Sequence, residues 1–148
     1  MRWFTRLIRA LFLVKEILSK EGAVHFRRYR LISTPWFNLY LHQILKSDED
    51  AHFHDHPWSF RSLILKGSYE EFWRCPPNFN ATHYRRYKAG EVVRHPAEDA
   101  HSITLVTPVV WTLVLTSGRT RVWGYRLDDG SWTDFKSYRQ LKNEGRLP

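Results

Sequence analysis

The chain has 148 residues, of which 43% are hydrophobic and 16% aromatic, and a formal net charge of +8. This length suits one domain with a full core rather than two, and the apolar content excludes wholesale disorder. The single cysteine, Cys75, excludes an internal disulfide and a zinc site built on cysteine pairs. No apolar run reaches the roughly 18 residues of a transmembrane span, and the longest, "ALFLV" at 10–14, fits a signal peptide badly. We therefore expect a cytoplasmic protein.

The first segment, residues 1–22, combines helical periodicity with most of the positive charge. Its apolar stripe consists of Phe4, Leu7, Ile8, Leu11, Phe12, Ile17 and Leu18. Residues 1–30 contain eight basic and two acidic side chains, a net charge of +6. We predict an N-terminal amphipathic α-helix packed on or beside the following domain, with its arginines in solvent. The alternative is a basic helix that lies, with Trp3, on an anionic membrane surface or a phosphate backbone.

After Gly22 the pattern becomes that of β-strands, in a single domain that we place at residues 23–148. Runs of β-branched and aromatic residues alternate with turn signals such as "STP", "KSDED", "CPPN", "KAG" and "LDDG". The predicted strands are 26–32, 36–45, 59–66, 68–74, 82–88, 91–94, 101–106, 109–116, 120–126 and 132–135, and "SYRQLKNEG" predicts a short helix. The fold class is all-β, because so many strands can close a barrel or fill a two-sheet jelly roll.

The stretch "HFHDH" at residues 52–56 suggests a metal site. In an extended segment, alternate residues point to the same face, so His54 and His56 present their imidazoles side by side, as does His52 if the strand begins early. Imidazole suits iron, zinc, copper and nickel, and a stable site needs a further ligand from a distant segment. The other histidines of the chain are His25, His42, His83, His95 and His101.

The stretch "GEVVRHPAEDAHSITL" resembles the second sequence motif of the cupin family, G-x5-P-x-G-x2-H-x3-N. Gly90, Pro96 and His101 stand at motif positions, whereas Glu98 replaces the second glycine and Leu105 the asparagine. Cupins are small β-barrels of the double-stranded β-helix, or jelly-roll, type. The resemblance thus implies a cupin barrel for this chain and a metal ligand at His101.

The first cupin motif, G-x5-H-x-H-x3,4-E-x6-G, is matched in its second half. Counting back seven residues from Gly67 reaches Phe60, where the family has glutamate, and four more reach His56. The resemblance therefore implies that His54 and His56, with His101, hold one divalent transition metal ion, and it leaves His52 outside. The phrases "LHQILKSDEDAHFHDHPWSF" and "SLILKGSYEE" also resemble small bacterial and phage cupin-domain proteins of unassigned activity.

Two departures from the family pattern affect the expected site. Phe60 removes a carboxylate that many metal cupins use, which leaves three neutral histidines and positions open to water, substrate or oxygen. That arrangement resembles the iron centres of thiol dioxygenases and diketone-cleaving cupins, so iron(II) is favoured, with zinc, nickel and manganese left open. Glu98 either orients an imidazole or, as we favour, is a solvated turn residue.

The remaining candidates receive other interpretations. We expect His52 at the rim of the site, His95 in a structural loop, and Asp55 pointing away from the histidine pair to form a salt bridge or a cap. His42 either packs in the barrel or, as we favour, points toward the metal cavity. The groups considered for orienting a substrate are Arg61, Arg94, Tyr40 and Tyr84, and the tryptophans assigned to core and wall are Trp58, Trp73, Trp111 and Trp123.

Three functions follow from this pattern. The favoured one is a mononuclear metalloenzyme, an iron(II)-dependent oxygenase acting on a small molecule. The second is a cupin that binds a small molecule or sugar without catalysis, with a structural metal or none. The third is an adaptor that works through its basic helix. Pairing of barrels into a homodimer is common among cupins and is left open for this chain.

Overall fold

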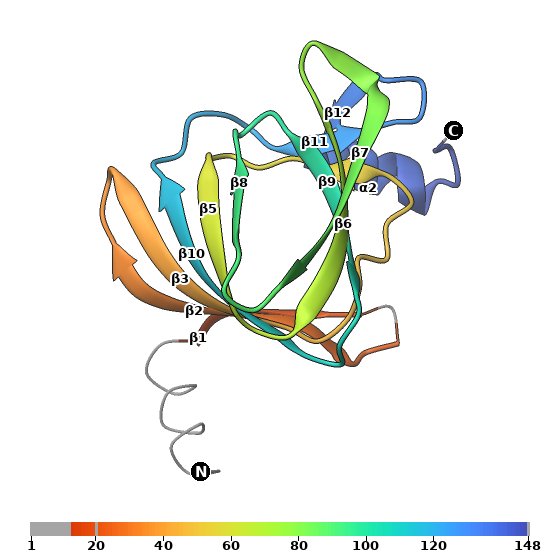
Figure 1. Ribbon diagram of the computed structural model, residues 1–148. Coiled ribbons are helices and arrows are strands. Elements are labelled where there is room, and N and C mark those ends of the chain that lie inside the picture. Colours follow the sequence, from red (N-terminus) through yellow and green to blue (C-terminus); the bar gives the residue numbers. More distant parts are fainter. Residues whose placement is uncertain (1–12, 20, 148) are drawn as a thin grey trace.

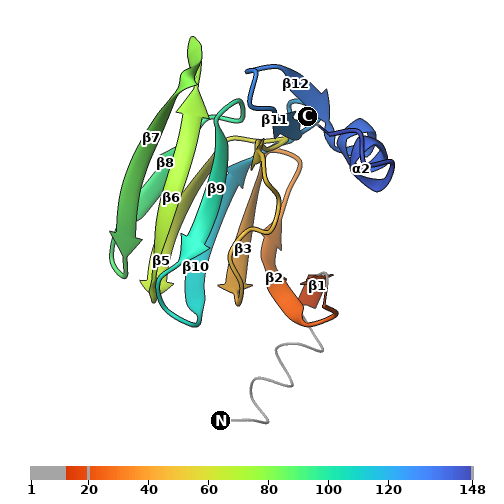
Figure 2. The ribbon, with the colours of Figure 1, turned by 90° about the vertical axis from the view of Figure 1, so that its right-hand side faces the viewer.

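The computed structural model describes residues 13–19 and 21–147, which form two antiparallel sheets facing each other, as Figures 1 and 2 show. The first sheet has the order β1 (Leu13–Leu18), β2 (Val24–Ser33), β3 (Phe37–Ile44), β10 (Val110–Ser117), β5 (Phe60–Lys66), β8 (Val92–His95). The second has the order β12 (Trp132–Asp134), β11 (Gly124–Arg126), β4 (Phe53–His54), β9 (Ala100–Leu105), β6 (Ser68–Cys75), β7 (Asn78–Lys88). One helix, α2 (Phe135–Asn143), follows β12. From β3 to β11 the chain crosses repeatedly between the sheets, as in a jelly roll.

The all-β prediction is confirmed, and the predicted strands correspond to observed ones from β2 onward. The strand expected at 120–126 is shorter and occupies only Gly124–Arg126, whereas the two-residue β4 had no prediction of its own. The short C-terminal helix is also confirmed, with Asp134 as its N-cap accepting from the backbone N–H groups of Lys136 and Ser137. Within the described ranges, no helix is long and apolar enough to cross a membrane.

The predicted N-terminal helix is wrong over residues 13–18. These residues form β1, which pairs antiparallel with β2 so that Glu16 lies opposite Arg27 and Lys15 opposite Arg28. Arg27 Nε lies 2.7 Å from Glu16 Oε2, and the two side chains form a cross-strand ion pair. Helical periodicity here was overridden because the open edge of β2 offers a partner to an extended segment. Residues 1–12 of the predicted helix lie outside the described residues.

The space between the sheets has an apolar end and a polar end. The apolar end is a cluster of Ile64, Tyr69, Tyr87, Val93 and Val110, all at most 7% exposed. Along the β6–β9 pair, Tyr69 lies opposite Leu105 in this cluster, whereas Trp73, four residues further, lies opposite His101. Four strand residues span about 13 Å, so one strand pair connects the core to the histidine-rich end.

The turn between β5 and β6 depends on Gly67, the residue that closes the first cupin motif. Its φ of +88° is in the left-handed region, and a Cβ there would lie 2.4 Å from the Val109 carbonyl oxygen. Glycine alone tolerates both conditions without strain. The turn directs β6, with its inward-facing residues, along the second sheet.

Candidate metal centre

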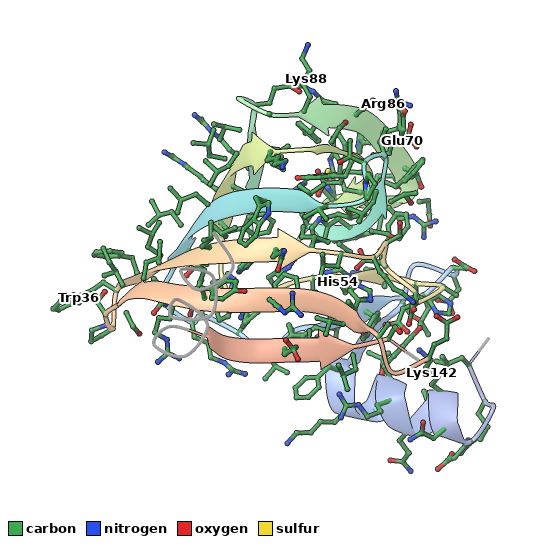
Figure 3. All side chains as sticks on the ribbon, turned by 90° about the horizontal axis from the view of Figure 1, so that it is seen from below. Trp36, His54, Glu70, Arg86, Lys88 and Lys142 are labelled. Carbon is green, nitrogen blue, oxygen red and sulfur yellow. The ribbon has the colours of Figure 1, made fainter. Side chains whose placement is uncertain are left out.

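Three histidines from two distant segments meet at the polar end of the barrel. His54 ends β4 and lies opposite His101 of β9, and His56 is held after the strand by its backbone N–H, which donates to the Ala97 carbonyl at 3.2 Å. The ring centroids are separated by 5.2 Å for His54 and His56, 4.7 Å for His54 and His101, and 4.8 Å for His56 and His101. One ligand atom of each ring lies within 4.8 Å of the others. In Figure 3, His54 lies toward the centre of the molecule, far from the Trp36 hairpin.

The electrostatics of His54 and His56 favour neutral imidazoles. Burial, followed by the influence of neighbouring histidines, holds the pKa of His56 well below its ordinary value, and burial is also the main cause that lowers the pKa of His54. Neutral imidazole is the form that binds metal. His56 Nδ1 is buried and has no hydrogen-bond partner among the described residues. The donor set therefore fits a divalent transition metal ion, which would satisfy this nitrogen.

A carboxylate that the sequence reasoning missed also belongs to the site. Glu71 of β6 is fully buried, and its Oε1 is hydrogen-bonded to His101 Nδ1 and, at 3.0 Å, to His95 Nε2. Burial raises the pKa of Glu71, but the hydrogen bonds with His101 and His95 outweigh it and lower the pKa to about 2. Glu71 thus stays ionised and directs Nδ1 of His101 toward itself. Its alternation with Tyr69 and Trp73 in "SYEEFW" was the sequence signal for an inward-facing carboxylate.

His95 is not the loop residue that we expected. It ends β8, is buried, and bridges two carboxylates, since its Nδ1 lies 2.9 Å from Asp99 Oδ2 and its Nε2 3.0 Å from Glu71 Oε1. Burial lowers the pKa of His95, but these two hydrogen bonds raise it to about 9. Glu71, His95 and His101 also form a second group whose ligand atoms lie within 4.8 Å of one another. Glu98, by contrast, is exposed, as we favoured.

Phe60 occupies the wall beside the histidines. Its ring centroid lies 4.9 Å from that of His56, 5.5 Å from that of His95 and 5.9 Å from that of His101. The position where the cupin motif has a carboxylate is therefore apolar, while β6, which pairs with β9, supplies Glu71 to His101 Nδ1.

Asp55 faces away from the histidine pair, as predicted, and anchors it. Its carboxylate, which is 1% exposed, accepts from the Gly124 backbone N–H at 2.7 Å and from Trp132 Nε1 at 2.8 Å, and it forms an ion pair with Arg121 at 2.7 Å. The Asp55 backbone N–H donates to the Gly124 carbonyl at 2.9 Å. These contacts hold the segment between His54 and His56 against β11 and β12.

Two further histidines lie near the site without joining the group. His52 is buried against α2, with Nδ1 3.0 Å from the Tyr138 hydroxyl, instead of lying at an open rim. His42 is buried inside the barrel, where its Nε2 accepts from Arg28 Nε at 3.0 Å. Of the two alternatives for His42, packing within the barrel is the one observed.

The groups considered for orienting a substrate divide into inner and outer residues. Arg61 and Arg94 are exposed cross-strand neighbours on the outer face of the first sheet, because the residues alternating with them, Ser62 and Val93, are buried inside. Tyr84 is 53% exposed, and its hydroxyl donates to Glu70 on the outside of the second sheet, where Figure 3 labels Glu70 beside Arg86. These three residues therefore cannot reach the histidines. Tyr40 is 6% exposed and faces the interior.

The tryptophans line walls, as expected, on different faces. Trp58 and Trp73 face the interior, and the Trp73 ring lies 5.3 Å from that of His83 and 5.9 Å from that of His95. Trp111 packs at 6.1 Å on Tyr29, and Trp123 stacks at 4.9 Å on Phe135 of α2.

No family model and no curated protein matches the sequence. Solved structures are similar in fold. HppE in its iron(II) form with an alternative substrate has a TM-score of 0.55 and 14% identity over 70% of this chain and 54% of its own. Hydroxypropylphosphonic acid epoxidase from S. wedmorenis has a TM-score of 0.51 and 14% identity over 69% of this chain and 55% of its own. KdgF from Halomonas sp. has a TM-score of 0.53 and 14% identity over 74% of this chain and 94% of its own.

The chain spans about half the length of the first two of these structures. At this level of identity, the likeness concerns the fold. It agrees with the two antiparallel sheets of this chain, between which the strands alternate as in a jelly roll. The chain has the cupin fold.

Proposed function

We propose that this chain is a mononuclear metal-binding cupin in which His54, His56 and His101 hold one divalent transition metal ion, and that it acts on a small molecule as an oxygenase-type enzyme. The observation that carries the proposal is that ligand atoms of the three histidines lie within 4.8 Å of one another, with His56 Nδ1 buried and without a hydrogen-bond partner among the described residues. Iron(II) is the favoured metal, and zinc, nickel and manganese are the alternatives. The iron(II) form of HppE, similar in fold, supports this choice.

The protein's own residues would prepare the site in two ways. Glu71 accepts from His101 Nδ1–H, which leaves Nε2 of that ring as the nitrogen for the metal and raises its basicity. Phe60 limits the access of water on the side of His56. When bound, an iron(II) ion supplies the capacity to bring an organic substrate and dioxygen together.

Metal content of protein purified without oxygen tests this proposal. We expect about one first-row transition metal ion per chain, as a single three-histidine site requires. His101→Ala should abolish binding, whereas His83→Ala, which removes an exposed histidine outside the cluster, should leave it unchanged. Undiminished metal binding in His101→Ala, or a wild-type chain that takes up no metal on reconstitution, would refute the site.

A second function is a small-molecule or sugar-binding cupin without catalysis, with a structural metal or none. It is favoured by the packing of Phe60 against His56 and His101, which places an apolar ring where an open position is expected. Oxygen consumption by the iron-loaded protein with a panel of small organic acids, thiols and diketones separates the two. Oxygen consumption that is lost in His101→Ala supports the enzyme. No oxygen consumption by a fully metal-loaded protein supports the binding protein. The homodimer and the cytoplasmic location stay predictions.

A further inference from the structure

Arg28 is a cation inside the barrel, next to the candidate metal centre. On β2 it lies opposite His42, which in turn lies opposite Thr112, and both of these partners are buried between the sheets. Its guanidinium carbon lies 4.8 Å from the ring centroid of Tyr40 and 5.6 Å from those of Phe26 and Trp58. Three aromatic rings therefore enclose the guanidinium and hold it by cation–π contacts.

Among residues 13–19 and 21–147, no acidic side chain forms an ion pair with Arg28. No carboxylate of a described residue lies within 4.0 Å of its guanidinium, in contrast to Arg27 with Glu16 and Arg121 with Asp55. Nε of Arg28 donates to His42 Nε2, and burial, followed by the charge of Arg28, keeps the pKa of His42 well below its ordinary value. His42 is consequently a neutral acceptor and offers no negative charge. Arg28 is partly buried, and a partly buried cation with no carboxylate beside it among the described residues favours the binding of an anion.

The surrounding charges are positive as well. Lys15 lies opposite Arg28 on β1, and Arg30 follows two residues later on β2. Desolvation, followed by the positive charges of Arg28 and Arg139, lowers the pKa of Lys15. Arg139 of α2 therefore adds to the positive potential around Lys15 and Arg28. Several cations on and beside β2 concentrate anions near Arg28.

The histidine centre is close to this cation. Trp58, one of the rings around Arg28, is only two residues beyond His56 and lies 6.3 Å from the Tyr40 ring. Trp58 therefore connects Arg28 to the segment that carries His56.

We propose that Arg28 binds an anionic oxygen group, a carboxylate or a phosphate, of the small molecule that reaches the histidine site. The placement of the other end of the molecule rests on the proposed metal centre, whereas the contact with Arg28 does not. Planar guanidinium matches both oxyanions with paired N–H donors. The substrate class of the proposed enzyme is thus a small organic anion.

Calorimetric titration of the metal-loaded full chain tests the proposal, with succinate, methyl phosphate and the uncharged succinamide as probes. We expect saturable binding of succinate or methyl phosphate, whichever anion the site accepts, and none of succinamide. Arg28→Gln should weaken binding about 10- to 100-fold, as expected for the loss of a charge-assisted hydrogen bond. Arg94→Gln, which removes an exposed charge on the outer face, should bind like wild type.

If Arg28→Gln does not fold, Arg28→Lys takes its place, and binding should again be weaker than in wild type because the paired donors are lost. Equal affinity in the folded Arg28 variant, equal binding of succinamide, or no binding of either anion would overturn the proposal. Metal content measured on the same samples separates the two proposals. A wild type without metal but with Arg28-dependent anion binding refutes the metal centre alone, and a fully loaded protein with Arg28-independent binding refutes the anion contact alone.

Discussion

Removing the Asp55 carboxylate should destabilise the fold and the candidate metal centre together. The side chain is 1% exposed and holds Arg121, the Trp132 indole and the Gly124 backbone at 2.7–2.8 Å. Asp55→Ala leaves three donors without their acceptor, one of them a cation whose side chain is 23% exposed. Breaking a buried charged pair by removing one partner costs about 3–5 kcal/mol, so we expect a loss of that size in the free energy of unfolding.

Urea denaturation of the metal-free protein measures this loss. Asp55→Asn keeps an acceptor for the Gly124 N–H but loses the charge that faces Arg121, so its stability should lie between wild type and Asp55→Ala. Glu98→Ala removes an exposed carboxylate from a nearby turn and should change the free energy of unfolding by less than about 0.5 kcal/mol. A loss below about 1 kcal/mol for Asp55→Ala, the range of a surface ion pair, would refute the anchoring role.

Glu71→Gln removes the charge that orients His101 and should lower metal affinity about 10- to 100-fold, measured by competition with a chelator; unchanged affinity would assign the carboxylate to folding alone. Burial raises the pKa of Asp50, but hydrogen bonds from Lys142 and Tyr125 outweigh it and hold the pKa below its ordinary value. A carboxyl group whose pKa is lowered in the folded state stabilises the fold above its unfolded pKa of 3.8, and this stability is lost as the pH falls through the folded-state pKa. The free energy of unfolding should therefore fall less steeply with decreasing pH in Asp50→Asn than in wild type. Identical pH profiles of the two proteins would contradict this. Gly124→Ala would place a Cβ 2.1 Å from a carbonyl oxygen of β12 and should lower the melting temperature by several degrees, whereas an unchanged value would show that β11 and β12 separate freely.

Several features of the candidate site were predictable because they depend on local periodicity. Alternation along an extended strand placed His54 and His56 on one face and Asp55 on the other. The same alternation also explains why Arg61 and Arg94 point outward and Glu71 inward. It could not be applied from the sequence alone, because the faces of the adjacent residues Ser62 and Val93 were not yet assigned. The turn residues Gly67 and Gly90 were recognisable because their positive φ angles suit glycine.

Other features depend on contacts between distant segments, which local periodicity does not encode. The residues of β1 have a helical stripe, but the open edge of β2 offered a partner strand that an isolated segment lacks. His95 received a structural role from its local sequence, because its partner Glu71 comes from a distant strand, whereas Asp99 lies only four residues away. The surroundings of Arg28 likewise became known only when β2 was placed beside β3, since this pairing puts Arg28 opposite His42.

By itself, the sequence determined that this protein is built of strands, that His54 and His56 share a face, and that His101 follows a cupin-like turn, because each of these depends on residues within a few positions of one another. Only the tertiary structure decided which side chains complete the site. It placed the ring centroid of His101 4.7 Å from that of His54 and brought Glu71 into hydrogen-bond contact with His101. It also placed Arg28 among aromatic rings, with no carboxylate of the described part of the chain in ion-pair contact. These distances depend on how strands distant in sequence pair within the two sheets. Between the sheets, a buried charge or donor without a partner costs free energy, so the surrounding side chains determine its role.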